Sequence, residues 1–299
     1  MSPVTKRYLP YLSLLSATLL WSSSFIALKL AFRAYDPMFV IFGRMIVATL
    51  FILLFLKPLR HLRYRKGDWK YLSFMGLCEP GLYFIFEAIA IENTSASQAG
   101  MITGTLPLIV GVVAWLILKE KMNARIISGF MLAIGGIVLL TLGSELTENA
   151  PNPLFGNFME FLAMVAATGY IITVKKLSDR YSSLFLTTFQ AFIGTLFYFP
   201  ILFLPSTDLP TAMSPVSAFA IIYLGIFVTF GAYGSYNYAV SKIPVSQATS
   251  FINLIPVFTL IMGVLILDER LTSIQYVAVA IVFMGIFLSQ SKSRTAIAT

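Results

Sequence analysis

The sequence predicts an all-α integral membrane protein with ten transmembrane helices in two inverted five-helix repeats. Three observations lead to this fold class. The chain has 299 residues, of which 58% are hydrophobic and only 11% are charged. Its apolar runs are long enough to cross a bilayer. The same phrase also occurs in both halves, as SASQAGMITGTLP at 95–107 and as PVSQATSFINLIP at 244–256.

The low charge content places the outer surface in lipid. A soluble globular protein has about 25% charged residues, whereas this chain has 11% and a mean hydropathy of +0.85. It therefore cannot cover its surface with polar groups in water. The single cysteine, Cys78, excludes an internal disulfide and a cysteine metal cluster. No motif in the chain calls for a cofactor, so none is expected.

Ten runs have the length that a transmembrane helix needs. About 20 apolar residues carry a helix across the hydrocarbon core. Charged residues or clusters of Pro, Asn and Gly separate the runs. The predicted spans are 8–31, 36–56, 71–91, 96–118, 124–143, 154–174, 183–204, 214–239, 246–267 and 272–290. The connections are short and leave no room for a soluble domain.

The basic residues predict the orientation. With the N-terminus in the cytoplasm, Lys29, Arg33 and Arg270 fall on the outer side and Arg44 falls inside a span. The remaining 21 − 4 = 17 Lys and Arg residues fall on the inner side. The positive-inside rule therefore predicts that both termini are cytoplasmic. The net charge of +8 then reflects topology, and the basic run 57–66 is expected to be an inner loop without a nucleic-acid partner.

The repeated phrase recurs at an offset of 246 − 97 = 149 positions. At the same offset LIL at 116–118 matches LIL at 265–267, Glu120 matches Glu269, and Gly136 matches Gly285. The repeats are predicted to cover residues 1–143 and 144–299. Because each half holds five spans, an odd number, the second half enters the membrane with the opposite orientation. Such inverted repeats are typical of secondary transporters that work by alternating access.

Longer motifs carry a resemblance to a known family. They are WSSSFIALK at 21–29, Pro37-x₆-Arg44, AIAIENTSASQA at 88–99, LPLIVGVVAWLILKEK at 106–121 and IPVFTLIMGVLILDER at 255–270. Over about residues 8–290 the chain resembles bacterial EamA-like members of the drug/metabolite transporter superfamily. It departs at Ser22, where the first span of the family often reads Trp-Gly. The resemblance implies a transporter of small metabolites, more often an exporter, in the cell (inner) membrane.

Four charged residues lie clearly within predicted spans, away from the span ends: Arg44, Glu79, Glu87 and Glu160. Such groups usually face a cavity or a partner. Arg44 lies about 10 Å and Glu87 about 6 Å below the outer surface, at a rise of 1.5 Å per residue, so the two are compatible with an ion pair. The alternative is that Arg44 reaches outward and Glu87 is solvated at the mouth. Glu160, about one and a half turns below the outer end, is expected to reach water and to be structural.

Amides replace this candidate pair in the second repeat, where Gln190 corresponds to Arg44 and Asn237 to Glu87. Glu79 lies near mid-depth, directly before Pro80, where a helix loses a hydrogen bond. Its i, i+4, i+8 spacing with Tyr83 and Glu87 predicts a common face. If that face lines a cavity, Glu79 is the best candidate for proton coupling or for the counter-charge of an amine. The alternative is a carboxyl bonded to a neighbouring helix.

Aromatic, polar and proline residues complete the predicted site. The spans that hold Trp21, Tyr83, Tyr233 and Tyr236 line the central cavity in the family that the chain resembles. The further candidate substrate-binding residues are Asn237, Gln190 and Asn253, and the candidate helix kinks or gates are Pro107 and Pro256. The hydroxyl groups of Ser97 and Ser246 are expected to cap the helices that they begin. Glu120 and Glu269 are expected to be solvent-facing and ion-paired.

These features predict a secondary transporter, and not an enzyme, for a small organic solute such as an amine or an amino acid. No G-x₄-G-K-[ST] phosphate loop is present, which disfavours an ATP-driven pump. A facilitative uniporter, an exchanger, a channel-like pore and an intramembrane enzyme are the alternatives. Protons are the candidate coupling ion. An organic cation would use Glu79 or Glu87 as its counter-charge, whereas a zwitterion would bind Arg44 through its carboxylate and Glu79 through its amino group. The sequence gives no oligomeric state.

Overall fold

The structure is a computed structural model that describes residues 3–54, 64–118 and 124–290. Glu120 and most of the basic run 57–66 lie outside the described residues. Within the described parts of the chain the regular elements are helices, and they occupy the ten predicted positions. The predicted all-α membrane fold is therefore confirmed.

The helices fall into two sets of five spans. In the first half they are α1 (Pro3–Phe32), α2 (Pro37–Leu53), α3–η2–α4 (Asp68–Gly76, Leu77–Leu82 and Tyr83–Asn93), α5–η3–α6 (Ala96–Ile102, Thr103–Thr105 and Leu106–Leu118) and α7 (Ala124–Leu142). In the second half they are α8 (Pro153–Leu177), α9 with η4 (Ser183–Tyr198 and Pro200–Phe203), α10–η5–α11 (Pro215–Tyr223, Leu224–Ala232 and Tyr233–Lys242), α12 and α13 (Val245–Ile252 and Ile255–Leu267) and α14 (Ser273–Gln290).

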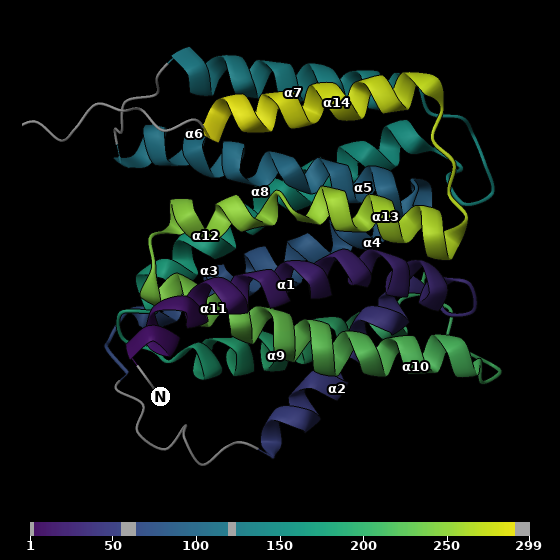
Figure 1. The fold of residues 1–299 in the computed structure, drawn as a ribbon. Helices are drawn as coiled ribbons and strands as arrows, with labels where there is room; N and C mark the ends of the chain where they lie inside the picture. The colour runs from purple at the N-terminus through teal and green to yellow at the C-terminus, as the bar shows by residue number, and fades with distance from the viewer. Residues whose placement is uncertain (1–2, 55–63, 119–123, 291–299) are drawn as a thin grey trace, which may run out of the picture.

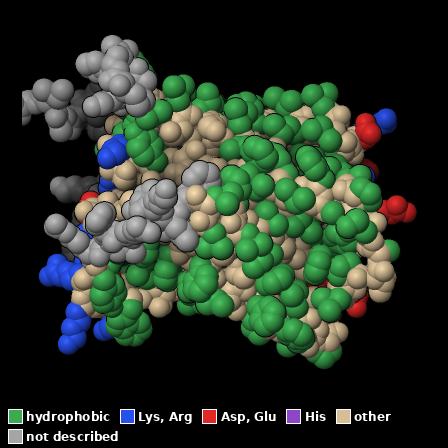
Figure 2. Space-filling view, turned by 90° about the horizontal axis from the view of Figure 1, so that it is seen from below, with side chains coloured by type: hydrophobic (Ala, Val, Ile, Leu, Met, Phe, Trp, Pro, Cys, Tyr) green, Lys and Arg blue, Asp and Glu red, His purple; other side chains and the backbone are tan. Residues whose placement is uncertain are grey.

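Length and composition suit these helices to a bilayer. Among the described residues, seven are long and apolar enough to cross a membrane. Three shorter apolar helices, Pro37–Leu53, Ile127–Leu142 and Ser273–Leu288, take the remaining places, which gives 7 + 3 = 10. Figure 2 shows a broad hydrophobic surface between the two ends of the molecule, with Lys and Arg mostly at one end and Asp and Glu mostly at the other. A surface of this kind suits contact with lipid.

Short polar residues begin several spans. Asp36 precedes Pro37, and its Oδ1 atom accepts hydrogen bonds from the backbone amides of Met38 at 2.8 Å and Phe39 at 3.4 Å. Asn152 precedes Pro153 in the same way at the start of α8. These side chains satisfy amides that have no partner within the helix. A proline in the first helical position costs no hydrogen bond. A capping Asp or Asn followed by Pro therefore marks where these spans begin.

Equivalent helices of the two halves pack in matching ways. α7 packs against α14 at one edge of the bundle, and α2 packs against α9 on the opposite side (Figure 1). The contact of α4 with α8 is matched by that of α11 with α1. This exchange of partners is what two inverted copies of one unit produce around an axis between them.

Two equivalent glycines set the approach of α7 and α14. A Cβ atom on Gly136 would lie 2.7 Å from Val282 Cγ2 and 2.9 Å from the backbone nitrogen of Val282. A Cβ atom on Gly285 would lie 2.6 Å from the backbone nitrogen of Ala133. Small residues allow such backbone approach between membrane helices. The matching glycines of the repeat therefore mark a symmetric helix crossing.

We expect Gly136→Ala to lower the stability of the protein by about 1–3 kcal/mol, because the new methyl group overlaps the backbone of α14. The neighbouring Gly135→Ala is the matched control, since a Cβ atom there meets nothing within 4 Å. Thermal unfolding of both variants in detergent measures the difference. Equal midpoints for Gly136→Ala and Gly135→Ala would show that the crossing tolerates a side chain.

Candidate functional site

Four spans, two in each repeat, are interrupted where they meet at the middle of the bundle. In the third and eighth spans the interruptions are η2 and η5, which have wide π-type turns. In the fourth span the tight turn η3 precedes Pro107. In the ninth span α12 ends at Ile252, and α13 begins at Ile255 with Pro256 in its first turn. Interrupted helices at mid-membrane are typical of transporter binding sites.

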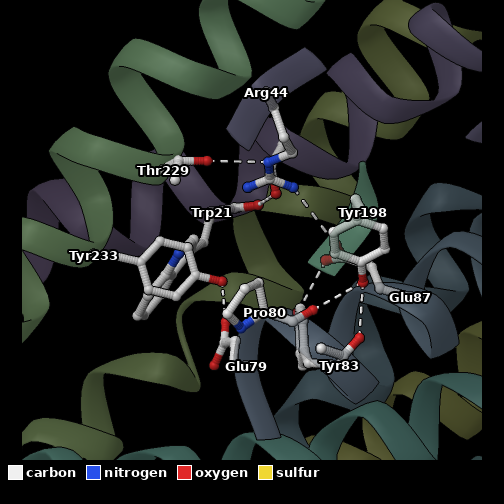
Figure 3. A network of polar contacts seen from close by, with 11 residues as sticks. Trp21, Arg44, Glu79, Pro80, Tyr83, Glu87, Tyr198, Thr229 and Tyr233 are labelled. Carbon is white, nitrogen blue, oxygen red and sulfur yellow. Dashed lines mark hydrogen bonds and ion pairs between the residues drawn. The ribbon is translucent and has the colours of Figure 1, made fainter. Parts of the chain in front are cut away.

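The interruption at Glu79 directs a carboxyl group inward. The backbone of Glu79 is extended, with φ −152° and ψ 118°, and Pro80 follows it. The hydroxyl of Tyr198 on α9 lies 2.9 Å from the carbonyl oxygen of Pro80 and 2.7 Å from that of Gly81, and it donates its hydrogen to one of them at a time (Figure 3). A neighbouring helix thus stabilises the non-helical backbone, as the hydrocarbon core requires.

A central cavity lies between these interruptions. Its volume is about 40 Å³, which holds about three water molecules at 10–15 Å³ each. Most of its wall is apolar or aromatic. The polar side chains that line it are Trp21, Ser24, Arg44, Glu79, Tyr83, Glu87, Thr103, Tyr170, Tyr233 and Tyr236. A pocket for an organic ligand measures about 300–1,000 Å³, so the helices must separate before a metabolite can bind.

Arg44 is buried from all sides. It is 1% exposed, and its Nη1 atom lies 3.8 Å from Oε2 of Glu87. Its Nε atom donates a hydrogen bond of 3.1 Å to Thr229 Oγ1, and its guanidinium lies 4.4 Å from the ring centroid of Phe84. Thr229 is the repeat equivalent of Glu79 at the offset of 150 that relates Glu87 to Asn237. Arg44 therefore joins the first repeat to the second.

Two equivalent tyrosines hold the two carboxyl groups of the cavity. Tyr83 donates a hydrogen bond of 2.9 Å to Glu87 Oε1, within α4. Tyr233, its repeat equivalent, donates to Glu79 Oε1 across the interface between the repeats (Figure 3). Glu87 has a cationic neighbour in Arg44, whereas the hydrogen-bond partner of Glu79 is the neutral hydroxyl of Tyr233. The two carboxyl groups are thus in different electrostatic environments.

The second repeat keeps the same positions without charge. The Tyr170 hydroxyl lies 3.0 Å from Gln190 Oε1 and 2.9 Å from Asn237 Oδ1, so it donates its hydrogen to one of them at a time. Asn237 also donates to Thr187 Oγ1 at 3.0 Å. Gln190 and Asn237 do not line the cavity themselves. They position Tyr170, which does.

Trp21 of α1 lines the cavity beside two tyrosines of the second repeat. Its ring centroid lies 5.2 Å from that of Tyr233 and 5.0 Å from that of Tyr236. Such tilted and edge-to-face pairs fix the orientation of aromatic rings. The indole nitrogen of Trp21 and the hydroxyl of Tyr236 are buried without a hydrogen-bond partner among the described residues. These two polar groups are therefore free to bind a ligand.

The structure brings most of the predicted site residues together. Trp21, Arg44, Glu79, Tyr83, Glu87, Tyr233 and Tyr236 all line the cavity. Asn253 lies between α12 and α13, beside the lining residue Ile252, and its side-chain amide atoms are buried without a partner among the described residues. Pro107 and Pro256 follow the interruptions but do not line the cavity. The residues before them, Leu106 and Ile255, do.

Sequence reasoning missed three residues that support the site, namely Tyr170, Tyr198 and Thr229. Thr229 carried a signal, since it is the repeat equivalent of Glu79. Tyr170 lies three residues after the lining residue Ala167 and so shares a helix face with it, but the sequence alone did not identify that face. Nothing in the sequence links Tyr198 to the carbonyl groups of η2, because that contact depends on how α9 packs.

Three predictions about surface-proximal residues were wrong. Glu160 does not reach water, because it is 0% exposed. Ser97 does not cap α5; Ser95 does so by accepting a hydrogen bond from the amide of Gln98 at 3.2 Å. Glu269 accepts hydrogen bonds from the backbone amides of Ala96 and Ser97 at 2.8 and 2.9 Å, where we expected an ion pair. The Ser246 side chain and Glu120 lie outside the described residues.

The arrangement suits reversible binding. Ionised, the cavity holds Arg44 with Glu87 and Glu79, a formal charge of 1 − 2 = −1. No group of three or more His, Cys, Asp or Glu side chains within the described ranges is placed to hold a metal ion. A small cavity between interrupted helices, sealed by paired polar groups, is the kind of site that membrane transporters use.

The comparisons with known proteins agree with this class of protein. The model of the EamA-like transporter family matches residues 9–142 and again residues 154–290. The chain therefore belongs to the EamA-like transporter family, and its two halves are two copies of the family unit. It is a multi-pass membrane transporter.

Several relatives have transporter names. The uncharacterized transporter YetK of Bacillus subtilis (strain 168) is 26% identical, over 97% of this chain and 89% of that protein. A probable terminal-alkyne amino-acid exporter of Streptantibioticus cattleyicolor is 24% identical, over 90% of this chain and 89% of that protein. A crystal structure with 18% identity superposes with a TM-score of 0.67, over 94% of this chain and 96% of that chain, and shows the fold alone.

We expect Arg44→Gln and Glu87→Asn each to destabilise the protein by about 3–5 kcal/mol, because each leaves a buried charge without its partner. The double variant copies the amides of the second repeat and should recover most of that loss. Unfolding of the four proteins in detergent gives the double-mutant cycle. Strictly additive effects would show that Arg44 and Glu87 do not stabilise one another.

Proposed function

We propose that the protein is a secondary transporter that exports a small organic cation by alternating access. The observation that carries this proposal is the difference between the two carboxyl groups of the cavity. Arg44 lies beside Glu87 at 3.8 Å, whereas Glu79 has a tyrosine hydroxyl as its partner. When both carboxyl groups are ionised, the formal charge of 1 − 2 = −1 in a water-poor cavity favours a ligand with one positive charge.

The aromatic wall supports the same ligand class. The rings of Trp21, Tyr233 and Tyr236 surround the space next to Glu79. Aromatic faces attract an ammonium group, by about 0.5–2 kcal/mol per ring. The unpartnered indole nitrogen of Trp21 and the hydroxyl of Tyr236 supply hydrogen bonds that would orient a polar part of the substrate. The apolar residues of the wall would hold its hydrocarbon part.

Alternating access is supported by the repeat and by the size of the cavity. A cavity of about 40 Å³ admits no metabolite, so binding requires one end of the bundle to open. The two repeats have interruptions at equivalent positions, which would provide equivalent bending points in the two halves. The chain would sit in the cell (inner) membrane with both termini in the cytoplasm, as its basic residues predict.

Protons are the proposed coupling ion. A carboxyl group can hold either a proton or an organic cation, so the two ligands would compete at Glu79. A proton gradient directed into the cell would then drive the cation outward. Tyr233 would serve both states, because its hydroxyl can donate to the ionised carboxylate and accept from the protonated acid.

An amino acid is the second candidate substrate. The relative named a probable terminal-alkyne amino-acid exporter supports it, as does the presence of both Arg44 and Glu79 in the cavity wall. A zwitterion would have to separate Arg44 from Glu87 in order to bind its own carboxylate. That step costs the buried ion pair, and the cation is therefore the first choice.

Transport into proteoliposomes with an imposed pH gradient tests the proposal. We expect phenethylamine to accumulate against its gradient in wild type, and Glu79→Gln to lose at least about tenfold of the rate, which corresponds to the loss of about 1.4 kcal/mol of binding. Glu92→Gln is the matched control, because it makes the same change at an exposed carboxyl group of α4. Amino acids serve as the comparison panel.

The outcomes separate the candidates. If amines fail to move while amino acids accumulate, the zwitterion replaces the cation as substrate. Normal amine transport by Glu79→Gln would contradict the role of that carboxyl group. Amine movement that ignores the pH gradient would leave a facilitative uniporter.

A further inference from the structure

Glu160 is a buried carboxyl group that binding at the central cavity does not use. It lies on α8, is 0% exposed, and neither of its carboxylate oxygens has a hydrogen-bond partner among the described residues. It does not line the cavity. A charged carboxylate in such a place would lack both a cation and a donor, and burying an unpaired charge is very unfavourable.

The position of Glu160 on α8 joins two regions. Asn157, Glu160, Met164 and Ala167 follow each other at spacings of three or four residues and share one helix face. Met164 and Ala167, toward the middle of the membrane, line the central cavity. Asn157, toward the predicted outer end, belongs to a polar network. Glu160 therefore lies between the predicted outer end and the cavity.

The polar network joins four segments near the predicted outer end. Asn157 accepts a hydrogen bond from Thr94 Oγ1 at 2.7 Å, and it donates to Gln98 Oε1 at 2.9 Å and to Thr141 Oγ1 at 2.8 Å. These bonds join α8 to α5, to α7 and to the junction after α4. In the closed arrangement these donors and acceptors are bonded to one another. When the segments separate, the same groups and water would be free to solvate the Glu160 carboxylate.

The ionisable groups nearest Glu160 come from α4. The negative charge of Glu87 acts on Glu160, and the Tyr83 hydroxyl lies within electrostatic range of Glu160. α5, η3, α6 and α12, which also pack on α8, contain no ionisable side chain. The other elements that pack on α8 carry their ionisable side chains along the cavity or toward the predicted inner end. These side chains are Cys78 and Glu79 of η2, Tyr233, Tyr236, Tyr238 and Lys242 of α11, Arg125 of α7, and Asp68, Lys70 and Tyr71 of α3.

We propose that Glu160 is a proton-binding site that permits closure of the predicted outer end only when it is protonated. In the open arrangement the carboxylate is solvated and takes a proton from the outer aqueous phase. The neutral acid can then be buried between α8 and α4. The proposal rests on the proposed transport cycle and on the predicted orientation. It adds a second proton site, apart from Glu79, where proton and substrate are proposed to compete.

The dependence of transport on external pH tests this site. Wild-type proteoliposomes should move phenethylamine several-fold faster as the external pH falls from about 8 to about 6, because a carboxyl group that is buried in the closed arrangement favours closure only in its neutral form. Glu160→Gln mimics the protonated acid, so it should keep transport and lose that dependence. A profile in Glu160→Gln that follows wild type would overturn the proposal, and so would a wild-type profile that is already flat.

A second measurement separates this site from the proposed function. The infrared difference spectrum of the purified protein between the two pH values should contain a carboxyl band that Glu160→Gln removes and Glu92→Gln retains. If phenethylamine is not transported at all, the proposed substrate is wrong. This band still shows whether Glu160 binds and releases a proton. Identical difference spectra for wild type and Glu160→Gln would show that Glu160 exchanges no proton.

Discussion

The ion pair between Arg44 and Glu87 is the interaction on which the central site depends. Hydrocarbon cannot solvate a guanidinium group, so Arg44 is acceptable at its depth only because Glu87, Thr229 and the ring of Phe84 surround it. Within this pair the carboxylate of Glu87 balances the positive charge of Arg44. In the proposed function, Glu79 is therefore the group that selects the charge of the substrate.

The same constraint explains the shape of the backbone. An interrupted helix in a membrane exposes amide and carbonyl groups, and these need partners from neighbouring helices. Tyr198 supplies such a partner at η2. The Glu269 carboxylate does the same for the first amides of α5, where the fourth span begins. The interruptions therefore persist where side chains of other spans support them. This support joins the two repeats, because Tyr198 and Glu269 lie in the second repeat and the backbone groups that they bind lie in the first.

The inverted repeat could be predicted from the sequence because its signals are local. Span length, the distribution of Lys and Arg, and the offset of 149 between the two SQA phrases depend on composition and order alone. Part of the cavity lining was also predictable, since Tyr83 and Glu87 follow helical spacing and Tyr233 is an equivalent of Tyr83. Glu79 lines the cavity as well, but from the non-helical backbone of η2 and not from the continuous helix face that its spacing predicted. Because the unit is duplicated, each position can be compared with its equivalent in the other half of the chain.

The errors have a common physical cause. Depth along a helix can be estimated from the sequence, but burial depends on what packs beside it. Glu160 lies close enough to the predicted span end to reach water, yet α4 and the polar network around Asn157 cover it. Ser95 caps α5 because the helix begins one residue earlier than the repeated phrase suggested. Glu269 finds backbone amides because the ninth span ends beside the start of the fourth.

The central claim is that Glu79 gives the cavity a single uncompensated negative charge. Equilibrium binding of phenethylamine and of its uncharged analogue 2-phenylethanol to the purified protein tests this claim most directly. The account predicts that wild type prefers the amine by at least about tenfold, or about 1.4 kcal/mol, and that Glu79→Gln removes the preference. Equal binding of both compounds to wild type, or a preference for the amine that survives in Glu79→Gln, would contradict it.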